Sequence, residues 1–540
     1  MSKRKLVCMA IATALSSSVF AGGLLTNTNT NIAFNRNFAR EGVIAIDGVY
    51  SNPAGVAFLS DGWHFSINNQ SAFQTRTIRS SITVPAFEGT PFYQPFKLNG
   101  GDEKGFKEFK GKATAPILPS FQVAYNKGKW GFQGSFALVG GGGKCTFNHG
   151  LGSFERTISL LPALLATAQN TYQQQYGIDL GLGTTTPGYS VDSYIHGQQY
   201  VFGLQFGSTY KLTDNFSVYG GFRFNYVLNK YKGNIRNISV NIGGNNENLY
   251  NYLGLKATAF AEQSAQAGQA ATTYQHLAEA EQAKIDGNPD LVAQYTAMAQ
   301  QYAQMAQLAG AGAQTMEGVR GQVADRYLEC TQTGWAICPI IGVDYRWNKL
   351  NIGARLEFTT HFNIQNDTKV DDTGMFADGV NTPGDMPGIF TIGAQYEVLP
   401  QWRVMGGYHL YFDKNAKMAD DKQKALTGNT QEFTLGTEYD VTKNITLSIG
   451  GQKTDYRLGN GAYLNDMSFV TDSYSLGFGA KVKVTEKVAV NVAYFFTKYD
   501  HFGKEYNQDF SAAGQTISAK CVDDFTRTNR VFGVGVDFDL

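Results

Sequence analysis

The sequence predicts an all-β fold, a 14-stranded antiparallel transmembrane β-barrel. Long stretches of alternating apolar and polar residues come in pairs that are joined by turns of two or three residues. Much longer polar loops separate one pair from the next, and no run beyond the first twenty or so residues is long and apolar enough for a transmembrane helix. A protein that crosses a membrane without such helices must close its sheet, because lipid cannot satisfy an open edge.

The pair from Gln198 to Leu228 shows the pattern. The alternation has a strict period of two, so one face suits lipid and the other suits a lumen. Thr213, Asp214 and Asn215 supply the turn between the two strands. The residues expected to face outwards are Tyr200, Phe202, Leu204, Phe206, Phe222, Phe224 and Tyr226.

The same module recurs along the chain, and we expect it to form one barrel over residues 61–540. The other short turns are expected at 126–129, 347–349, 399–401, 442–444 and 485–487. With a first strand after Asp61 and a last one ending at Leu540, the count is about fourteen, an even number as in single-chain bacterial barrels.

Composition agrees with a barrel and excludes other classes. The chain has 61 glycines and 13 prolines in 540 residues, with 13% aromatic residues and a formal net charge of zero. A balanced charge gives no basic surface for nucleic acid. No linker divides the chain into separate domains.

The N-terminus predicts export. Lys3, Arg4 and Lys5 precede an apolar stretch, and cleavage after Ala21 would remove residues 1–21 as a signal peptide. Cys8 precedes almost the whole apolar stretch, which disfavours a lipoprotein signal. Export and a barrel together predict the outer membrane of a Gram-negative bacterium. The surroundings there are outer-membrane lipid and lipopolysaccharide, and the barrel-assembly machinery is an expected partner.

Four cysteines follow the predicted cleavage site: Cys145, Cys330, Cys338 and Cys521. An even number in an exported protein favours disulfides, and the short spacing of Cys330 and Cys338 makes that pair plausible. Four cysteines still allow three connectivities. A metal site is disfavoured because the sequence has no CxxC motif and no paired histidine.

The stretch from 22 to 60 is too irregular for a strand and too long for a simple tail. It begins at Ala21-Gly22, passes Gly42 and Asp47, and ends in Asn52-Pro53-Ala54 immediately before the first predicted strand. In this it resembles the FadL-type outer-membrane transporters of long-chain fatty acids and other hydrophobic molecules, which include the TodX-like proteins. The resemblance extends over the full length, because that family also has fourteen strands.

The resemblance implies that residues 22–60 fold inside the barrel as a hatch, which substrate binding shifts. Asp47, Asn52, Pro53 and Ala54 would then take part in gating. The alternative for the Asn-Pro-Ala segment is a tight turn that delivers the chain into the first strand.

The resemblance also implies lateral release beside a kinked third strand. Here that strand runs from Trp130 to Val139 and breaks into Gly140, Gly141, Gly142 and Gly143. These glycines would be the opening or its rim, since they weaken the ladder. The alternative is a flexible strand end that enters an external loop.

Long loops should lie outside the cell, at 146–195, 230–332 and 361–386. Helical sequence is expected at about 158–176 and 257–325, the second as a hairpin followed by a third short helix after a break near Gly310. The resemblance implies a capture site on such loops, formed here by Leu160, Leu161, Leu164 and Leu165. Packing against the barrel rim is the alternative for these leucines. The Ala/Gln-rich hairpin is less apolar and is expected to be a cap or a surface for a partner.

A fatty-acid carboxylate in an apolar tunnel needs a compensating charge. By strand parity Arg223 and Arg355 point into the lumen, as does Glu357. Arg355 and Glu357 are expected to brace the barrel as a salt bridge. Arg223 lacks so obvious a partner and is the candidate for the carboxylate, since arginine binds carboxylates bidentately.

An enzyme is disfavoured, because none of the seven histidines lies in a G-x-S-x-G context. The sequence therefore predicts passive transport of long-chain fatty acids or other hydrophobic molecules, without a cofactor, by a protein expected to be a monomer. The alternative is a barrel-based surface receptor or adhesin that uses the external hairpin. A general porin is disfavoured because the N-terminal segment would have no purpose in an open channel.

Overall fold

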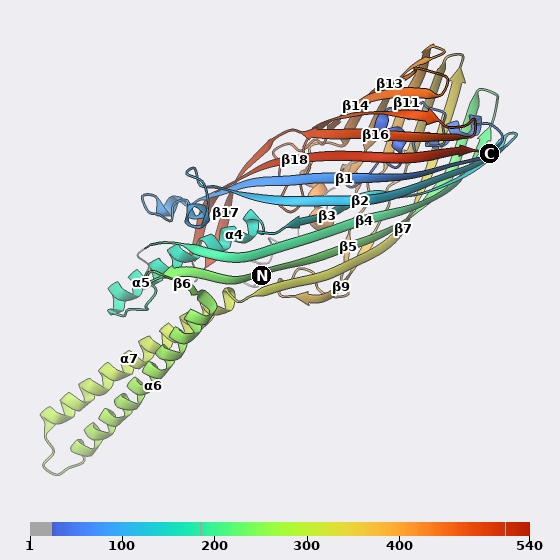
Figure 1. Cartoon of the computed structure of the whole chain (residues 1–540). Coiled ribbons are helices and arrows are strands. Elements are labelled where there is room, and N and C mark those ends of the chain that lie inside the picture. The colour runs from blue at the N-terminus through green and yellow to red at the C-terminus, as the bar shows by residue number, and fades with distance from the viewer. Residues whose placement is uncertain (1–23, 184–185, 513–514) are drawn as a thin grey trace.

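The wall of the protein is a closed antiparallel β-barrel (Figure 1). The computed structural model describes residues 24–183, 186–512 and 515–540. The predicted signal peptide, Cys8 and the Ala21-Gly22 pair lie outside these residues. Strand β1 (Gly62–Thr83) pairs with β2 (Phe106–Lys127) on one side and with β18 (Gln515–Asp539) on the other, which closes the sheet.

Fourteen strands form this wall within the described residues, so the predicted fold class is confirmed. The other eleven are β3 (Trp130–Phe147), β4 (Tyr189–Lys211), β5 (Phe216–Ile242), β7 (Arg326–Trp347), β8 (Leu350–Glu357), β11 (Ile389–Leu399), β12 (Trp402–Tyr411), β13 (Thr430–Asp440), β14 (Ile445–Asp455), β15 (Ser473–Lys483) and β16 (Val488–Tyr499).

Shorter strands extend the wall at the end opposite the short turns. β9 (Asn363–Asp371) takes the place of β8 beside the outer half of β7, and β10 (Asn381–Pro383) pairs with β9. β17 (Phe502–Ala512) pairs with β18, and β6 (Asn245–Asn248) with β5. Strands β1, β2, β4, β5, β7 and β18 are therefore much longer than the roughly 11 residues that cross a bilayer. The predicted external loop from Lys230 accordingly begins only after Ile242.

The alternation of the side chains follows the prediction. Leu204, Phe206 and Phe222 point outwards and are exposed, whereas Gln205 and Arg223 point inwards and are buried. Exposed tryptophans flank the short turns at Trp130, Trp347 and Trp402, and Trp63 lies at the start of β1. An outward apolar band with an aromatic girdle is the surface of a transmembrane barrel.

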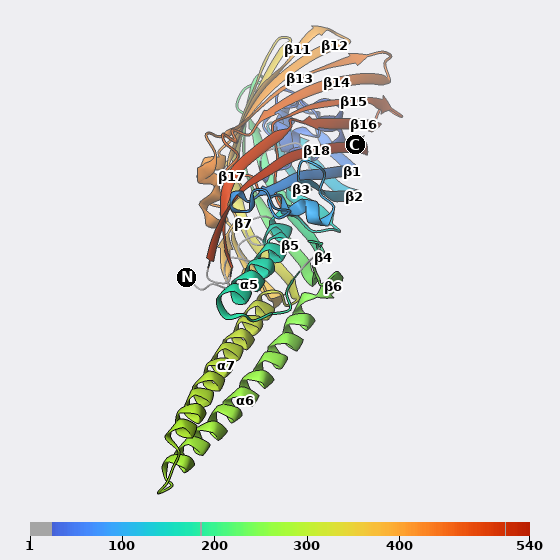
Figure 2. The same ribbon diagram turned by 90° about the vertical axis from the view of Figure 1, so that its left-hand side faces the viewer.

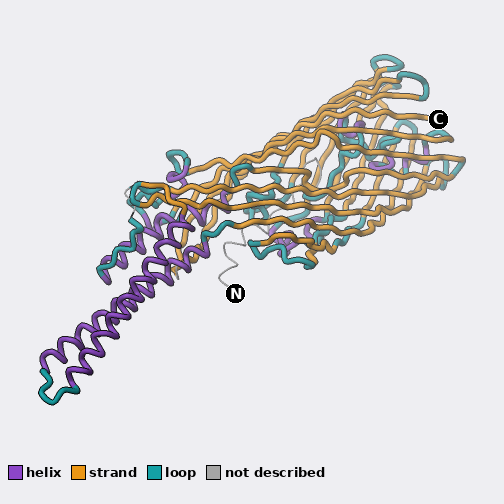
Figure 3. Tube along the Cα trace, turned by 60° about the horizontal axis from the view of Figure 1, so that its bottom comes forward, coloured by secondary structure: helices purple, strands orange, loops and turns teal. Residues whose placement is uncertain are grey.

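The six predicted short turns all join neighbouring strands, as at 128–129 between β2 and β3 and at 348–349 between β7 and β8. The N-terminal segment lies inside the barrel near this end (Figures 1 and 3). It contains α2 (Ile32–Arg36), α3 (Gly48–Ser51) and the 3₁₀ turn η1 (Gly55–Phe58). Nearly all of its side chains are buried, so residues 24–60 fill this part of the lumen as a hatch.

Loops at the opposite end carry the longer helices (Figure 2). α4 (Gly152–Ser159) and α5 (Leu161–Tyr176) cover the mouth, and α6 (Leu249–Gln282) and α7 (Pro289–Gln322) form a projecting hairpin. The expected third short helix is wrong, because α7 continues through Gly310 and Gly312. Helical neighbours there supply the packing that offsets the glycine penalty. Within the described residues, no helix combines the length and the hydropathy of a membrane-spanning helix.

Short 3₁₀ segments complete the loops at the mouth: η2 (Pro85–Phe87), η3 (Pro95–Asn99), η4 (Asp413–Asn415) and η5 (Ala419–Ala425), the last of which is kinked at Asp420 and Asp421. The loop between β12 and β13 folds back towards the lumen, where Met418 is buried and forms a β-bridge with Gly384.

The proposed Cys330–Cys338 disulfide is wrong, since Cys145, Cys330, Cys338 and Cys521 are all free, buried thiols. Cys330 and Cys338 lie on the same strand, β7, eight residues apart. An extended chain separates them by about 26 Å. A disulfide requires Cα atoms within about 7 Å.

We expect Cys330 and Cys338 to remain thiols in protein purified without reductant, because their strand holds them too far apart to pair. Alkylation in denaturant followed by peptide mass spectrometry measures this. Protein reduced before alkylation is the control, and both samples should give the same modified peptides. A Cys330–Cys338 linked peptide confined to the unreduced sample would contradict the assignment.

Candidate functional site

The hatch is held in the lumen by a buried ionic network. Arg40 of the hatch binds Asp47 through both Nε and Nη2, at 2.7 and 2.8 Å, and its Nη1 lies 3.0 Å from Glu438 of β13. Arg36 donates to the same Glu438 oxygen at 2.7 Å. Burial alone would lower the pKa of Arg40, but the carboxylates of Asp47 and Glu438 raise it above its ordinary value. Asp47, a predicted gating residue, is thus part of the hatch's link to the wall.

A second link joins the hatch to β12. His409 lies 2.7 Å from Glu41 of the hatch and 2.9 Å from Glu432 of β13. Tyr411 donates its hydroxyl to the same Glu432 at 2.6 Å. Each charge in this buried cluster has a partner of opposite sign or a hydrogen bond, as burial of charge requires.

The Asn-Pro-Ala segment is bound directly to the wall. Asn52 donates its side-chain amide to Asp344 of β7 at 2.6 Å. Gln133 of β3 donates to the carbonyl of Pro53 at 2.7 Å, and Ser217 of β5 donates to the carbonyl of Ala54 at 2.7 Å. The segment is therefore not only a tight turn into β1, because side chains of three wall strands form hydrogen bonds with it.

Close backbone contact accompanies these bonds. A Cβ on Gly42 would overlap the backbone of Ala394 in β11, so only glycine lets the hatch approach the wall there. Asn351 of β8 donates to the Gly42 carbonyl at 2.9 Å and to Asp344 at 2.8 Å. Gly42, which belongs to the pattern of the sequence resemblance, thus lies where the backbone of the hatch contacts the backbone of β11.

Arg223 and Arg355 do not form a free carboxylate site, and the view that Arg223 lacks a partner is wrong. Arg223 makes a bidentate pair with Glu357, at 2.7 and 3.0 Å. Arg355 lies 3.3 Å from Glu357 and donates to the carbonyl of Tyr50 in the hatch. Both guanidinium groups also stack on the Tyr50 ring, at 5.0 and 4.5 Å from its centroid. Strand parity gave their direction correctly but did not reveal the pairing across β5 and β8.

The ladder between β2 and β3 is interrupted. Phe121 pairs with Phe136, and the next pair is Lys112 with Thr146. Between them, residues 113–120 of β2 and 137–145 of β3 do not pair with each other. Pro116 and Pro119 fall in this part of β2 and have no N–H to donate. The wall therefore has a lateral gap at the predicted glycine run.

The first residues of the hatch cover this gap from inside. The Asn27 N–H donates to the Val139 carbonyl at 2.9 Å, and the Gly141 N–H donates to the Leu25 carbonyl at 3.0 Å. A Cβ on Gly140 would lie 2.7 Å from the Leu25 carbonyl, and Gly141 has a φ of 95°. The glycines thus remain part of β3, kinked and bonded to the hatch, rather than a flexible strand end.

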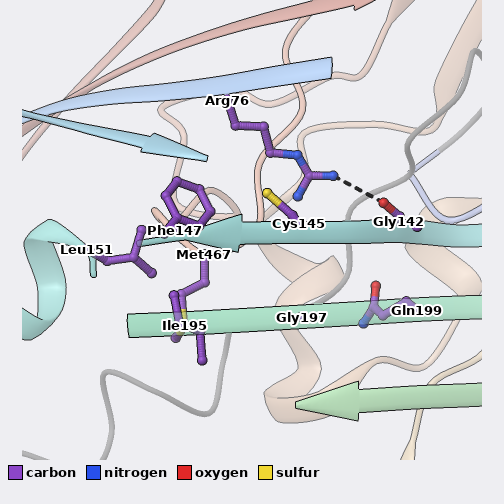
Figure 4. A pocket seen from close by; sticks show the side chains of 10 residues that line it. Arg76, Gly142, Cys145, Phe147, Leu151, Ile195, Gly197, Gln199 and Met467 are labelled. Atoms are coloured by element: carbon purple, nitrogen blue, oxygen red, sulfur yellow. Dashed lines mark hydrogen bonds between the residues drawn. The ribbon is translucent and has the colours of Figure 1, made fainter. Parts of the chain in front are cut away.

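A small cavity lies at the kink (Figure 4). Gly142, Cys145 and Gln199 line it, and Arg76 of β1 reaches across the gap to donate to the Gly142 carbonyl at 3.4 Å. Ile195 and Leu151 close its other side (Figure 4).

A larger chamber of about 350 Å³ lies between the hatch and the loops at the mouth of the barrel. Its apolar lining includes Leu25 of the hatch and the residues Val201, Val227, Ile364, Phe376, Met375, Met386 and Met418. Its polar lining includes Asn229, Gln332, Asn381, Asp420 and Lys422. Because Gly141 and Leu25 both line it, the chamber reaches the kink and the gap.

Lys422 of η5 supplies a cation to this chamber. Burial lowers the pKa of its ammonium from 10.5 to about 8, although Asp420 opposes this shift. Its Nζ lies 4.9 Å from the centroid of the Tyr463 ring. Sequence reasoning missed Lys422 because it lies in a loop without periodicity, where no pattern places a side chain in the lumen.

Three of the four predicted capture leucines line an apolar groove of about 70 Å³ at the mouth. Leu160, Leu161 and Leu164 face Ile235, Ile238 and Phe510 there. Leu160 is also buried against the rim residues Ile82 and Phe109, and Leu165 is buried in the neighbouring cluster. The leucines therefore pack against the barrel rim and also line an apolar groove.

The cavities form a series in which each shares lining residues with the next. The groove shares Phe154 and Ile235 with a small cavity that Ile195 also lines. Ile195 lines the cavity at the kink as well, and Gln199 lines both that cavity and the chamber. No group of three or more metal-ligating side chains occurs among the residues described here.

Comparison with solved structures gives the fold. A Pseudomonas aeruginosa FadL homologue matches with a TM-score of 0.55 at 11% identity, covering 96% of this chain and 100% of that one. The Ralstonia pickettii toluene transporter TbuX matches with a TM-score of 0.43 at 13% identity over 92% of this chain and 94% of its own. The Pseudomonas putida toluene transporter TodX matches with a TM-score of 0.44 at 12% identity over the same shares. No protein-family model and no curated protein matches this chain. The chain thus has the fold of the FadL homologue, a barrel with an internal hatch.

We expect Asn52→Ala to loosen the hatch, because it leaves the buried Asp344 with one hydrogen bond fewer. The loss of such a bond costs about 1–3 kcal/mol. Hydrogen exchange of peptides from residues 24–60 should accelerate by about tenfold to a hundredfold. Gln401→Ala, in an exposed short turn, is the control and should leave this exchange unchanged. Unchanged exchange in both variants would contradict the anchoring role.

Proposed function

We propose that this protein carries hydrophobic and amphipathic molecules passively across the outer membrane. The observation that carries the proposal is a row of separate cavities that share lining residues: the apolar groove at the mouth, two small cavities, and the chamber beside the gap between β2 and β3. The fold shared with a FadL homologue supports it. The outer membrane is proposed from the barrel surface and the predicted signal peptide.

The proposed path begins at Leu160, Leu161 and Leu164, where burial of apolar surface captures the substrate. It continues past Ile195 to the chamber. The hatch closes the remaining way, since Leu25 and Asn27 are bonded to β3 across the gap. Movement of residues 24–31 would free the carbonyl and N–H groups of β3 and open the gap sideways into the membrane.

An amphipathic anion such as a long-chain fatty acid fits the chamber best. Its chain would contact the methionine and valine side chains, and its carboxylate would be compensated by Lys422. Arg223 and Arg355 are not proposed for this role, because Glu357 and Tyr50 already occupy both guanidinium groups.

Locking the gap should block transport. Ser120 and Ala137 come next in register after the pair Phe121–Phe136, and both line one small cavity beside the hatch. The oxidised S120C/A137C variant should take up a radiolabelled long-chain fatty acid at the level of the empty vector, and reduction should restore uptake.

The matched control is the pair Y125C/F132C, which lies in the intact part of the same ladder and faces outwards. Its oxidation should leave uptake unchanged. Full uptake by the oxidised S120C/A137C protein, with the cross-link confirmed by mass spectrometry, would exclude lateral exit at this gap.

Lys422 should select for anions. Lys422→Met should reduce fatty-acid uptake by about tenfold, the worth of roughly 1.4 kcal/mol, and should leave uptake of a neutral aromatic hydrocarbon unchanged. Since a lysine loses its charge as the pH rises through its pKa of about 8, the preference of the natural protein for the anion should fall between pH 7 and pH 9. Lys424→Met, an exposed lysine on the same turn, is the control. Equal loss of both substrates in Lys422→Met would contradict an electrostatic role.

A further inference from the structure

The hairpin of α6 and α7 contributes only its root to the cavities described above. Its helices have 34 residues each, about 50 Å of helix. Figures 1 and 2 show it leaving the barrel on the side of β5 and β7 and extending well beyond the other loops.

The two helices form an antiparallel coiled coil. The more buried residues of each helix recur at alternating intervals of three and four, the heptad spacing of a coiled-coil seam. Tyr274 stacks on Tyr302 with ring centroids 5.5 Å apart, and Ser264 donates to the Ala306 carbonyl at 2.7 Å. The seam consists of Leu253, Ala257, Phe260, Ser264, Ala267, Ala271, Tyr274 and Ala278 in α6 and of Val292, Tyr295, Ala299, Tyr302, Ala306, Ala309, Ala313 and Met316 in α7.

Alanines alternate with Tyr274, Tyr295 and Tyr302 along this seam in the distal half, and Tyr274 contacts both of the other rings. The two edges beside the seam differ in chemistry. One edge, which we call the apolar edge, carries Ala270, Leu277, Leu291, Met298 and Met305. The opposite edge carries Gly268, Gln275, Gln282, Thr296 and Ala303.

The root of the apolar edge is already a helix-docking surface. The Tyr172 hydroxyl of α5 lies 3.4 Å from Thr315 Oγ1 in α7, and α5 side chains join Ala313 and Val319 in one apolar cluster. Tyr252 of α6 donates its hydroxyl to Gly181, which follows α5. Because α5 ends at Tyr176, the distal part of the same edge is left to solvent, and Leu277 and Met305 are each 42% exposed.

We propose that the distal apolar edge docks against the same edge of a second copy of this chain in the same membrane, forming a four-helix bundle in place of the monomer that the sequence resemblance implies. Its residues from Ala270 to Leu277 and from Leu291 to Met305 include no charged side chain on this edge. The acidic residues Glu262, Glu279 and Asp290 occupy outward positions of the heptad, and Asp286 lies in the turn between the two helices. Two identical apolar edges therefore meet without bringing like charges together, and a two-fold axis places Leu277 opposite Leu277.

The size of the edge points to a copy rather than to a soluble partner. One row of side chains, about 32 Å long from the level of Gln263 to that of Lys284, buries far less than the roughly 1,200 Å² of a stable interface. A second copy anchored in the same membrane holds its edge at the same height and at high effective concentration. Since α5 covers the root, the two hairpins converge towards their tips.

Cysteine cross-linking in intact outer membranes tests this. The four described cysteines are all buried, so a new surface thiol is the reactive one. Leu277→Cys should give a disulfide-linked dimer on mild oxidation, seen as a band of twice the monomer mass on a non-reducing gel. Gln275→Cys, two residues away on the opposite edge, should give less than a tenth of that dimer. Gln263→Cys, on the same edge near the root, should also give little.

A second set of variants distinguishes a specific interface from random encounters between chains in the membrane. Met298→Lys with Met305→Lys, added to Leu277→Cys, should lower the dimer at least tenfold, because charges would then meet in the interface. Thr296→Lys, on the opposite edge, should leave it unchanged. Equal cross-linking of Leu277→Cys and Gln275→Cys would overturn the proposal. So would a cross-link of Leu277→Cys to another protein, or one formed only between copies on different cells, shown by mixing differently tagged strains.

Discussion

Pairing of the backbone around the wall is the constraint on which the rest of this structure depends. A membrane leaves no water for an unpaired N–H or C=O group, so every strand must find two neighbours. The β2–β3 ladder breaks this requirement between Lys112 and Phe121. Residues 25–27 repair it by forming a short bridge to Val139, Gly140 and Gly141. The hatch therefore completes the wall as well as filling the lumen. Its position decides whether the gap between β2 and β3 is covered.

The hatch is held by polar contacts more than by apolar packing. Arg36 and Arg40 both pair with Glu438, Arg40 also pairs with Asp47, and Glu41 shares His409 with Glu432. Buried ion pairs contribute little net stability when complete, but the loss of one member is costly. Such a network fixes one position of the hatch sharply.

Apolar surface in this protein lies where a hydrophobic solute would need it. The outward band faces the membrane, the groove at Leu161 and Leu164 opens at the mouth, and the chamber combines methionine and valine walls with the charge of Lys422. Between the chamber and the Arg223–Glu357 pair, Tyr50, Val201 and Val227 form an apolar layer. That layer keeps the two paired arginines away from the chamber, so Lys422 is the cation nearest to a bound solute among the residues that line it.

Local pattern determined a large part of the result. Period-two alternation gave the outward and inward faces, because parity along a strand decides direction regardless of what lies opposite. The short turns predicted the number of strands. They also marked the end of the barrel near which the hatch lies. Asn52, Pro53 and Gly42 were identified by resemblance, and each makes the wall contact that fixes the hatch.

Tertiary structure alone decided which groups meet across the barrel. Arg223 pairs with Glu357 over a separation of 134 residues, Lys422 enters the chamber from an irregular loop, and Cys330 and Cys338 are kept apart by the strand that they share. The sequence alone determined the period, the turns and the class of fold, since these depend on neighbours along the chain. Partners, cavities and the gap depend on closure of the sheet, which brings together residues that no local pattern relates.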